Sequence, residues 1–204
     1  MAASQVVQVI DDDADVRQSL AFLLSTAGLA VRVHDSAVSF LKVLDEVQSG
    51  CVVTDIRMPQ MDGLELQRRL RAQGSKLPVI VMTGHGDVAL AVEAMKAGAV
   101  DFIEKPFDDD VLLAAIRTAL SRHAEDSERE ARKAVIQDRL KALSEREREV
   151  LGWLVAGNAN KVIAHELGIS PRTVEVYRAN VMTKMQADSL SDLVRMALVE
   201  GEAL

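Results

Sequence analysis

The sequence predicts a doubly wound parallel α/β sheet of five strands, followed by a helical linker and a small all-α unit. Five short apolar runs alternate with segments of helical period between residues 6 and 121. Beyond residue 142 apolar residues recur only at helical spacing, and the stretch from 122 to 142 carries mixed charge without Gly or Pro. We therefore expect a first unit over 1–121, a helical linker over 122–142 and a four-helix unit over 143–204.

The five apolar runs have the length and composition of strands that are buried on both faces of a sheet. They occupy residues 6–10, 30–34, 51–55, 78–83 and 101–104. The segment after each run has apolar residues three or four positions apart; after the first run these are Val16, Leu20, Leu23 and Leu24. Short strands joined by helices form a parallel sheet with helices on both faces, so five such units complete a domain.

A tight turn between two helices is the main feature of the region after residue 142. Ser144 and Glu147 form an S-x-x-E capping box that opens its first helix. Gly168 can end one helix in the left-handed conformation, while Ser170 caps the next helix and Pro171 takes its first position. Two helices joined in this way make a helix-turn-helix, whose second helix normally enters the DNA major groove.

Composition limits the other classes of protein. The chain is 49% hydrophobic with a formal net charge of −7, as is typical of soluble globular proteins. No apolar run is long enough to span a membrane and the N-terminus lacks the regions of a secretory signal, so we expect a cytoplasmic protein without membrane contact. Cys51 is the single cysteine, which excludes an internal disulfide. Its apolar surroundings predict a buried, unreactive thiol.

Polar side chains stand where the predicted strands end. Asp11 and Asp12 follow the first strand, Asp55 ends the third, Thr83 ends the fourth and Lys105 follows the fifth. The functional crevice of an open α/β sheet lies beyond the carboxyl ends of its strands, so we expect these side chains to converge. Two carboxylates 5 Å apart repel by about 3 kcal/mol at an effective dielectric of 20. A divalent cation removes that cost, and Mg²⁺ prefers carboxylate, water and phosphate oxygens.

Such a site is suited to phosphoryl transfer. An aspartate can act as the nucleophile and form an aspartyl phosphate, and Lys105 and Thr83 could bind the phosphoryl oxygens. The simpler alternative is that the aspartates only cap helices or lie in turns, which is common for any single one of them. That alternative does not account for five polar positions at one sheet edge. Asp13 is the exception, and we expect it only to start a helix in solvent.

The strings "VIDDD", "VVTDIRMPQMDGLEL", "PVIVMTGHGD" and "DFIEKPF" resemble the motifs of the response-regulator receiver domain, a flavodoxin-like fold, over residues 5 to about 121. The resemblance implies that Asp55 is the phosphoacceptor. It also implies an Mg²⁺ site at Asp55, in which Asp12 is a direct ligand, Asp11 acts through water and the backbone carbonyl of Arg57 is the third protein contact. One departure is Gln60, because such loops often have Gly there.

The same resemblance assigns the residues that respond to phosphorylation. Thr83 is similar to the hydroxyl that turns towards the phosphoryl group, and Lys105 to its salt-bridge partner. Phe102 stands where the family has the aromatic that changes rotamer with the threonine, and Pro106 where it has a proline after a cis bond. A receiver assists its own phosphorylation and dephosphorylation but is not an enzyme towards other substrates.

Enzymes with other phosphate chemistry fit less well. The chain has no glycine-rich phosphate loop of either common type. A phosphatase of the haloacid-dehalogenase kind would need a second aspartate two residues after Asp55, where Arg57 stands. A phosphatase or phosphotransfer enzyme that acts on outside substrates is left as a rival.

The second helix of the predicted helix-turn-helix has two distinct faces. Val174, Tyr177, Val181 and Met185 lie on one side and should pack inward. The opposite arc should meet base edges, Lys161 and Lys184 should meet phosphates, and Arg178 is equally placed to touch DNA or to brace the domain. The DNA-contact candidates are Lys161, Arg172, Thr173, Glu175, Val176, Arg178, Ala179, Asn180 and Lys184.

Charge alone does not favour DNA over a protein partner. Residues 143–204 carry seven Lys and Arg against nine Asp and Glu, a net charge of −2. Residues 161–184 carry four basic against two acidic residues, a net charge of +2, so a basic face is still possible. On charge alone a helical unit that binds protein or RNA is the better alternative.

The strings "LSEREREVL", "NKVIAHELGISPRTVEVYR" and "MTKM" resemble the LuxR-type helix-turn-helix over about 143–200, and the two units together resemble the FixJ subfamily of response regulators. Glu175 departs from many LuxR-type relatives, which carry a basic residue there; an acidic side chain favours a cytosine amino group over phosphate. The resemblance implies a partner histidine kinase, a homodimer formed on phosphorylation, and activation of transcription at promoter DNA with RNA polymerase. The subfamily further suggests an oxygen-sensing kinase and nitrogen-fixation genes. Our candidates for the dimer surface on the fourth helix and fifth strand are Val92, Lys96, Asp101 and Ile103.

Overall fold

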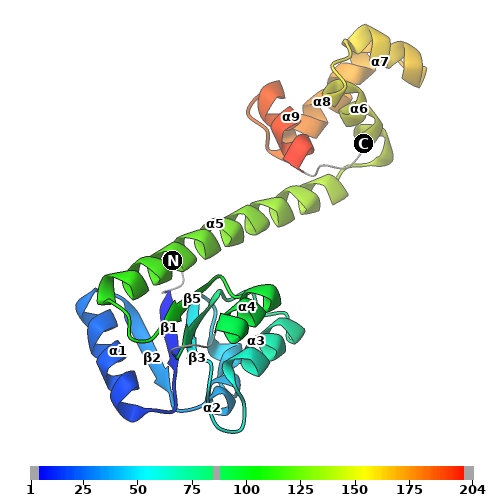
Figure 1. Ribbon diagram of the computed structural model, residues 1–204. Coiled ribbons are helices and arrows are strands. Elements are labelled where there is room, and N and C mark those ends of the chain that lie inside the picture. Colours follow the sequence, from blue (N-terminus) through cyan, green and yellow to red (C-terminus); the bar gives the residue numbers. More distant parts are fainter. Residues whose placement is uncertain (1–4, 85–87, 200–204) are drawn as a thin grey trace. The chain divides into compact units, whose positions relative to one another are not determined.

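A computed structural model of the chain describes residues 5–84 and 88–199, which divide into two units, Met1–Asp126 and Ser127–Leu204 (Figure 1). The first unit is built on five parallel strands in the order β2-β1-β3-β4-β5, which confirms the predicted doubly wound sheet. Pro78 stays outside the fourth strand and Gly50 joins the third, so the expected bounds move by one residue at most. The strands are β1 (Val6–Ile10), β2 (Ala30–His34), β3 (Gly50–Asp55), β4 (Val79–Thr83) and β5 (Asp101–Glu104).

Helices cover both faces of the sheet, and each face has its own apolar core (Figure 1). On one face Leu20 and Leu24 of α1 (Ala14–Thr26) pack with the start of α5 (Asp109–Lys141). The other face is covered by α2 (Ala37–Leu41), α3 (Gly63–Ala72) and α4 (Val88–Ala97), with the short 3₁₀ turn Leu44–Glu46 after α2. Cys51 lies in the core with 0% exposure, and burial raises the pKa of its thiol to about 12, so the predicted unreactive role is confirmed.

Asp13 begins α1 as expected. Its exposed side chain accepts hydrogen bonds from the backbone N–H of Asp15 at 2.8 Å and of Val16 at 3.3 Å. These bonds satisfy two of the donors that the first turn of a helix leaves unpaired. Asp13 therefore differs in role from the two aspartates before it.

The second unit is helical, as predicted. The S-x-x-E box is present, because Ser144 Oγ accepts from Glu147 N while Glu147 Oε2 accepts from Ser144 N at 2.7 Å. Gly168 adopts the left-handed conformation with φ 64°, and Ser170 Oγ caps the helix that follows. The helices are α6 (Glu145–Val155), α7 (Asn160–Leu167), α8 (Pro171–Met185) and α9 (Leu190–Val199). Across the described residues, no helix combines the length and apolar character that crossing a membrane requires.

The segment expected as a linker is part of one long helix. α5 runs for 33 residues without interruption, so the segment is helical as expected and continues the last helix of the receiver unit. Ile136 is only 4% exposed and packs in the core of the second unit, and Leu140 packs against the same core. Val135, next to Ile136, is 50% exposed. The last turns of α5 are thus a structural part of the second unit, because an apolar stripe at 136, 140 and 143 faces its core.

Gly50 should be the glycine least tolerant of substitution. It has φ 143°, and a Cβ added there would lie 1.9 Å from the backbone oxygen of Val6 on the neighbouring strand. We expect Gly50→Ala to lower the free energy of unfolding by about 3 kcal/mol or more, since backbone cannot move aside as a side chain can. Gly74, with φ 75° and open space around it, is the matched control. Gly74→Ala should cost about 1 kcal/mol, from backbone conformation alone. Chemical denaturation measures both, and equal losses would contradict the steric account.

Candidate functional site

The carboxyl edge of the sheet brings together three of the predicted site residues through one ammonium group. Lys105 Nζ donates to Asp11 Oδ2 at 2.8 Å and to Asp55 Oδ1 at 2.6 Å. The lysine lies 94 residues from one partner and 50 from the other in sequence. They meet because β1 and β3 are neighbours in the sheet and the loop after β5 passes the same edge.

The remaining oxygens of the two carboxylates are also paired. Asp55 Oδ2 accepts from the backbone N–H of Arg57 at 2.7 Å, and Asp11 Oδ1 accepts from that of Asp13 at 2.9 Å. Asp11 is 2% exposed and Asp55 9%. Burial alone would lower the pKa of Lys105, but its hydrogen bonds and charge pairing with Asp11 and Asp55 outweigh this and raise it. The site is a compact cluster in which one ammonium lies between two carboxylates and offsets only part of their negative charge.

The other predicted residues of this edge lie around the cluster. Thr83 is 2% exposed and its backbone oxygen accepts from Lys105 N at 2.7 Å, whereas Asp12 is exposed to solvent. Phe102 is 44% exposed on β5. The Lys105–Pro106 peptide bond is cis, as the resemblance implied. Gln60, the departure from the family pattern, has φ 67°, a left-handed conformation that glycine adopts more readily than glutamine.

The donor chemistry at this edge fits Mg²⁺, although the carboxylates do not form a ready cage. Over residues 5–84 and 88–199, no group of three His, Cys, Asp or Glu side chains is arranged to hold a metal ion. Asp11 and Asp55 nevertheless present hard oxygen atoms close together, and Asp12 adds a carboxylate on the solvent side. Mg²⁺ is commonly held by one or two carboxylates with water in its other positions. Lys105 now occupies the space between Asp11 and Asp55 and neutralises their repulsion.

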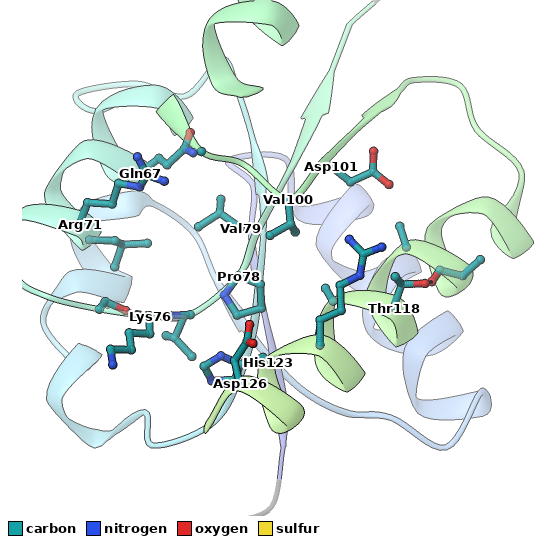
Figure 2. Close-up of a pocket in the computed structure, with 18 of the residues that line it drawn as sticks. Gln67, Arg71, Lys76, Pro78, Val79, Val100, Asp101, Thr118, His123 and Asp126 are labelled. Atoms are coloured by element: carbon teal, nitrogen blue, oxygen red, sulfur yellow. Dashed lines mark hydrogen bonds between the residues drawn. The ribbon is translucent and has the colours of Figure 1, made fainter. Parts of the chain in front are cut away.

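A separate groove lies at the opposite edge of the sheet, away from Asp11, Asp55 and Lys105. It has a volume of about 740 Å³ and lies at the amino ends of β4 and β5, where Pro78, Val79, Val100 and Asp101 contribute to its walls (Figure 2). The phosphoacceptor candidate Asp55 stands at the carboxyl end of its strand, across the sheet from this groove. The site is therefore identified by its convergent charged groups and not by the size of a hollow.

One of the four residues predicted for the dimer surface is buried. Val92, Lys96 and Asp101 are exposed, with Val92 at 47%. Ile103 is only 4% exposed and packs in the core beneath α1 and α5, so its side chain cannot contribute to a surface in this conformation. Alternate residues of a strand point to opposite faces, and the residue of β5 that points outward beside it is Phe102.

Sequence reasoning missed three exposed apolar side chains near this surface. Met95 and Val100 are each 42% exposed, and Phe102, which was considered only as a switch, is 44% exposed. Met95 stands three residues after Val92, so helical spacing was the signal that could have identified it. Together with Val92 they make four exposed large apolar side chains on α4, on β5 and on the turn between them, which we call the α4–β5 patch.

The faces of α8 agree with the helical wheel. Val174, Val181 and Met185 are each 0% exposed, and Tyr177 is partly buried against the same core. The predicted outer residues are exposed, except that Thr173 and Arg178 are half-buried. Those exposed are Arg172, Glu175, Val176, Ala179 and Asn180.

A groove of about 540 Å³ in the second unit gathers some of the predicted DNA contacts. Lys161, Glu175 and Arg178 line it together with Asn158 and Asn160, which sequence reasoning missed. The polar string "NANK" before α7 was the signal available for them. No side chain caps α7, whose N-cap is Ala159, so its first backbone N–H groups lack that partner. This side of the unit offers donors and a lysine for anionic groups.

Lys184 has a partner inside the unit. Its ammonium donates to Glu147 Oε2 at 2.6 Å and to the backbone oxygen of Ala142 at 3.3 Å. Glu147 is 3% exposed, and the hydrogen bond from Lys184, with that from the Ser144 backbone, holds the pKa of its carboxyl below the usual range. The expected phosphate contact of Lys184 stays a prediction, and it would have to share this ammonium with a buried carboxylate.

Comparison with known proteins identifies the family in which these two units occur together. The response regulator receiver domain matches residues 7–117, and the bacterial regulatory proteins of the LuxR family match residues 141–197. The chain is 60% identical over 203 residues to the transcriptional regulatory protein FixJ of Azorhizobium caulinodans, covering 100% of this chain and 96% of that protein. The chain belongs to the FixJ-type response regulators. It is a transcriptional regulator with a receiver domain and a LuxR-type DNA-binding domain.

Further relatives agree with this assignment. FixJ of Bradyrhizobium diazoefficiens is 56% identical over 195 residues, 96% of this chain and 95% of that protein. The crystal structure of full-length FixJ from B. japonicum is 54% identical, with both chains covered at 100% and a TM-score of 0.63. The structure of the response regulator StyR is 42% identical, with a TM-score of 0.86 over 96% of this chain and 98% of that one. These relatives favour DNA over protein or RNA as the partner of the helical unit, and a regulator over an enzyme.

The Glu147–Lys184 pair makes a pH-dependent contribution to stability. The pKa of Glu147 is lower in the folded than in the unfolded protein, so the unfolded state binds more protons as the carboxylate titrates. The stabilisation is therefore complete above the ordinary value of 4.5 and is lost as the pH falls through the folded pKa. Glu147→Gln keeps a residue that can complete the capping box. The difference in unfolding free energy between wild type and Glu147→Gln should be largest at neutral pH and shrink in acid.

Denaturant unfolding followed by the fluorescence of Trp153, the single tryptophan, measures this difference in the second unit. Glu145→Gln is the matched control, because Glu145 is exposed in the same first turn of α6. A difference for Glu147→Gln that stays constant as the pH falls from neutral to well below 4.5, within the range where the protein still folds, would contradict the ion-pair account.

Proposed function

We propose that Asp55 is the phosphoacceptor of this regulator. The observation that carries the proposal is the contact of Lys105 with both Asp11 and Asp55 at the carboxyl edge of the sheet. This contact places a nucleophilic carboxylate beside a cation that can pair with the phosphoryl oxygens. The side chain of Asp55 is 12% exposed, so the oxygens reach solvent while the strand behind them is buried.

The transfer step uses the groups of this chain in a simple order. An oxygen of Asp55 attacks phosphorus, the bond from phosphorus to the histidine nitrogen of the kinase breaks, and the electron pair returns to the imidazole. Lys105 exchanges one carboxylate partner for a phosphoryl oxygen, and the hydroxyl of Thr83 donates to another. In dephosphorylation the oxygen of a water molecule attacks phosphorus, the bond from phosphorus to the Asp55 oxygen breaks, and inorganic phosphate leaves with the carboxylate of Asp55 restored.

We assign Mg²⁺ to the same edge. Receiver domains generally bind this ion for phosphorylation, and the match covers residues 7–117. Asp11, Asp12, Asp55 and the backbone carbonyl of Arg57 are the groups that would hold it. When bound, the ion supplies positive charge that lowers the repulsion between the carboxylates and an incoming phosphoryl group.

We propose that phosphorylation moves the side chains of Thr83 and Phe102, and that this movement changes the α4–β5 patch. The four large apolar side chains of the patch are between 42% and 47% exposed, and exposed apolar groups near one another in sequence are candidates for a protein contact. A homodimer formed here, with Lys96 and Asp101 at its polar rim, would carry two helix-turn-helix units. Linking two weak DNA-binding units raises their joint affinity through effective concentration.

The DNA contacts are proposed for α8 and the start of α7. Arg172, Glu175 and Val176 lie on the exposed face of α8 towards its N-terminal half, which is the part of a recognition helix that reads bases. Ala179, Asn180, Thr173 and Arg178 extend this face. Lys161 stands at the uncapped start of α7, where backbone N–H groups and the helix dipole favour a phosphate. We retain Lys184 as a weaker candidate for a phosphate contact.

In the cell we propose a cytoplasmic transcription activator that receives its phosphoryl group from a histidine kinase and acts with RNA polymerase at promoters. Membership of the FixJ type supports nitrogen-fixation genes as targets. An oxygen-sensing kinase as the partner stays a prediction from the resemblance to the subfamily. The helix-turn-helix and receiver families support the kinase and DNA as the two partner classes.

Phosphorylation should occur once per chain and should depend on Asp55. Acetyl phosphate with Mg²⁺ should give a single phosphoryl adduct by mass, a dimer in solution and stronger binding to duplex promoter DNA in a band-shift assay. Asp55→Asn should abolish all three. Asp13→Asn is the matched control, because asparagine caps a helix as well as aspartate and Asp13 lies outside the cluster. If phosphorylation left both the oligomeric state and DNA binding unchanged, this activation mechanism would be wrong.

Mg²⁺ should stabilise the folded receiver unit. Millimolar Mg²⁺ at neutral pH should raise the melting temperature, since a ligand that binds only the folded state shifts the unfolding equilibrium. Asp12→Ala should abolish this rise, whereas Asp13→Asn should keep it. A wild-type protein whose melting temperature is indifferent to Mg²⁺ would remove the metal assignment.

A further inference from the structure

The C-terminal ends of α5 and α8 are joined by two basic side chains. Arg139 of α5 donates from Nη1 to the backbone oxygen of Met185 at 2.9 Å and from Nη2 to Gln186 Oε1 at 2.6 Å. In the other direction Lys184 of α8 donates to the backbone oxygen of Ala142, just after α5, at 3.3 Å. Each helix end thus receives a cation from the other helix.

A third cation comes from α6. Arg148 donates from Nε to the backbone oxygen of Leu140 and from Nη2 to that of Lys141, both at 3.3 Å. The last four carbonyls of a helix have no partner within it, and together they carry a partial negative charge. Two such ends cannot be brought together without donors and positive charge between them. We call Arg139, Arg148 and Lys184 the basic clasp.

The surroundings of the clasp show that it is built into the fold. Ile136, one turn before Arg139, is 4% exposed in the core of the second unit, and Met185, whose carbonyl Arg139 binds, is 0% exposed. Gln186 ends α8 in a left-handed conformation with φ 52°, which turns its side chain and backbone out of the helical path. Arg139 is half-buried at this junction and binds both residues at once. A planar guanidinium presents its donors in a rigid fork that suits two adjacent acceptors, whereas the donors of lysine radiate from a single nitrogen on a flexible stem.

We propose that the basic clasp fastens α6 and α8 to the end of α5, and that Arg139 is a positioning residue for the recognition helix. α5 begins at Asp109 in the receiver unit and runs unbroken to Lys141. A stiff joint at its end lets a change in α5 reach α8 directly, where a flexible joint would absorb it. This inference rests on the proposed role of α8 in DNA binding and adds the residues that connect α8 to the phosphorylated unit.

The test uses the full-length protein and the duplex that the wild type selects from a random-sequence pool. Three variants are compared: Arg139→Met removes the donors, Arg139→Lys keeps one charged donor, and Arg132→Met is the control. Arg132 lies two turns earlier on the same side of α5, is exposed, and makes no hydrogen bond or ion pair within the described residues. For each variant we would measure DNA affinity with and without acetyl phosphate, the salt dependence of binding, and hydrogen exchange in residues 182–187.

In Arg139→Met, exchange at the end of α8 should accelerate. The ratio of phosphorylated to unphosphorylated affinity should fall roughly three- to tenfold, the range expected when a coupling contact is lost. Arg139→Lys should recover part of both effects, and Arg132→Met should behave as wild type. The slope of log affinity against log salt should stay unchanged in every variant, because a positioning residue releases no counterions from DNA.

Each contrary result has a definite meaning. A salt slope reduced by about 0.9 in Arg139→Met would identify a direct phosphate contact and overturn the clasp. Two other results for Arg139→Met would also overturn the clasp. One is hydrogen exchange at the end of α8 as slow as in the wild type. The other is a ratio of phosphorylated to unphosphorylated DNA affinity equal to that of a wild type that does respond to phosphorylation. If phosphorylation did not change the DNA affinity of the wild type, the proposed activation mechanism would fail. The hydrogen-exchange rates would still decide whether Arg139 holds α8.

Discussion

Electrostatic balance at the carboxyl edge of the sheet is the constraint on which the receiver unit depends. Parallel strands in the order found here place the ends of β1 and β3 side by side, and both carry carboxylates. Those carboxylates are almost buried, so water screens them poorly and a cation has to lie between them. Lys105 provides it from the loop after β5. Any metal ion or phosphoryl group that enters must therefore share or replace the contacts of this one ammonium.

The position of each strand in the sheet determines which parts of the receiver can respond. All six residues of β3 are buried, so the strand that presents Asp55 is held on both faces and on both edges. β5 is an edge strand with three of its four residues exposed. When Lys105 changes its partner, β3 on one side is therefore held firmly, whereas β5 on the other side is less constrained. In the activation mechanism that we propose, movement would therefore be directed outward to β5 and the neighbouring helix α4 and not into the centre of the sheet.

Local patterns predicted most of the fold, and contacts distant in sequence explain what they missed. The strands, the capping box at Ser144 and the left-handed Gly168 depend on neighbouring residues, which a sequence displays directly. The cluster of Asp11, Asp55 and Lys105 was predictable because parallel topology brings strand ends together. Ile103 was wrongly placed on the surface because a short edge strand does not reveal which of its alternating faces is covered. The pairing of Lys184 with Glu147, 37 residues away, left no local sign at all.

The burial of Ile136 has a consequence for how this architecture can be divided and recombined. A boundary drawn where the mixed-charge segment ends would leave Ile136 and Leu140 on the receiver fragment and open a gap in the core of the other. A boundary before the final turns of α5 would cut only exposed residues such as Arg129 and Arg132. Exchange of receivers among related proteins, in evolution or in the laboratory, is thus tolerated at a point inside a helix, provided that the helical register is kept across the junction.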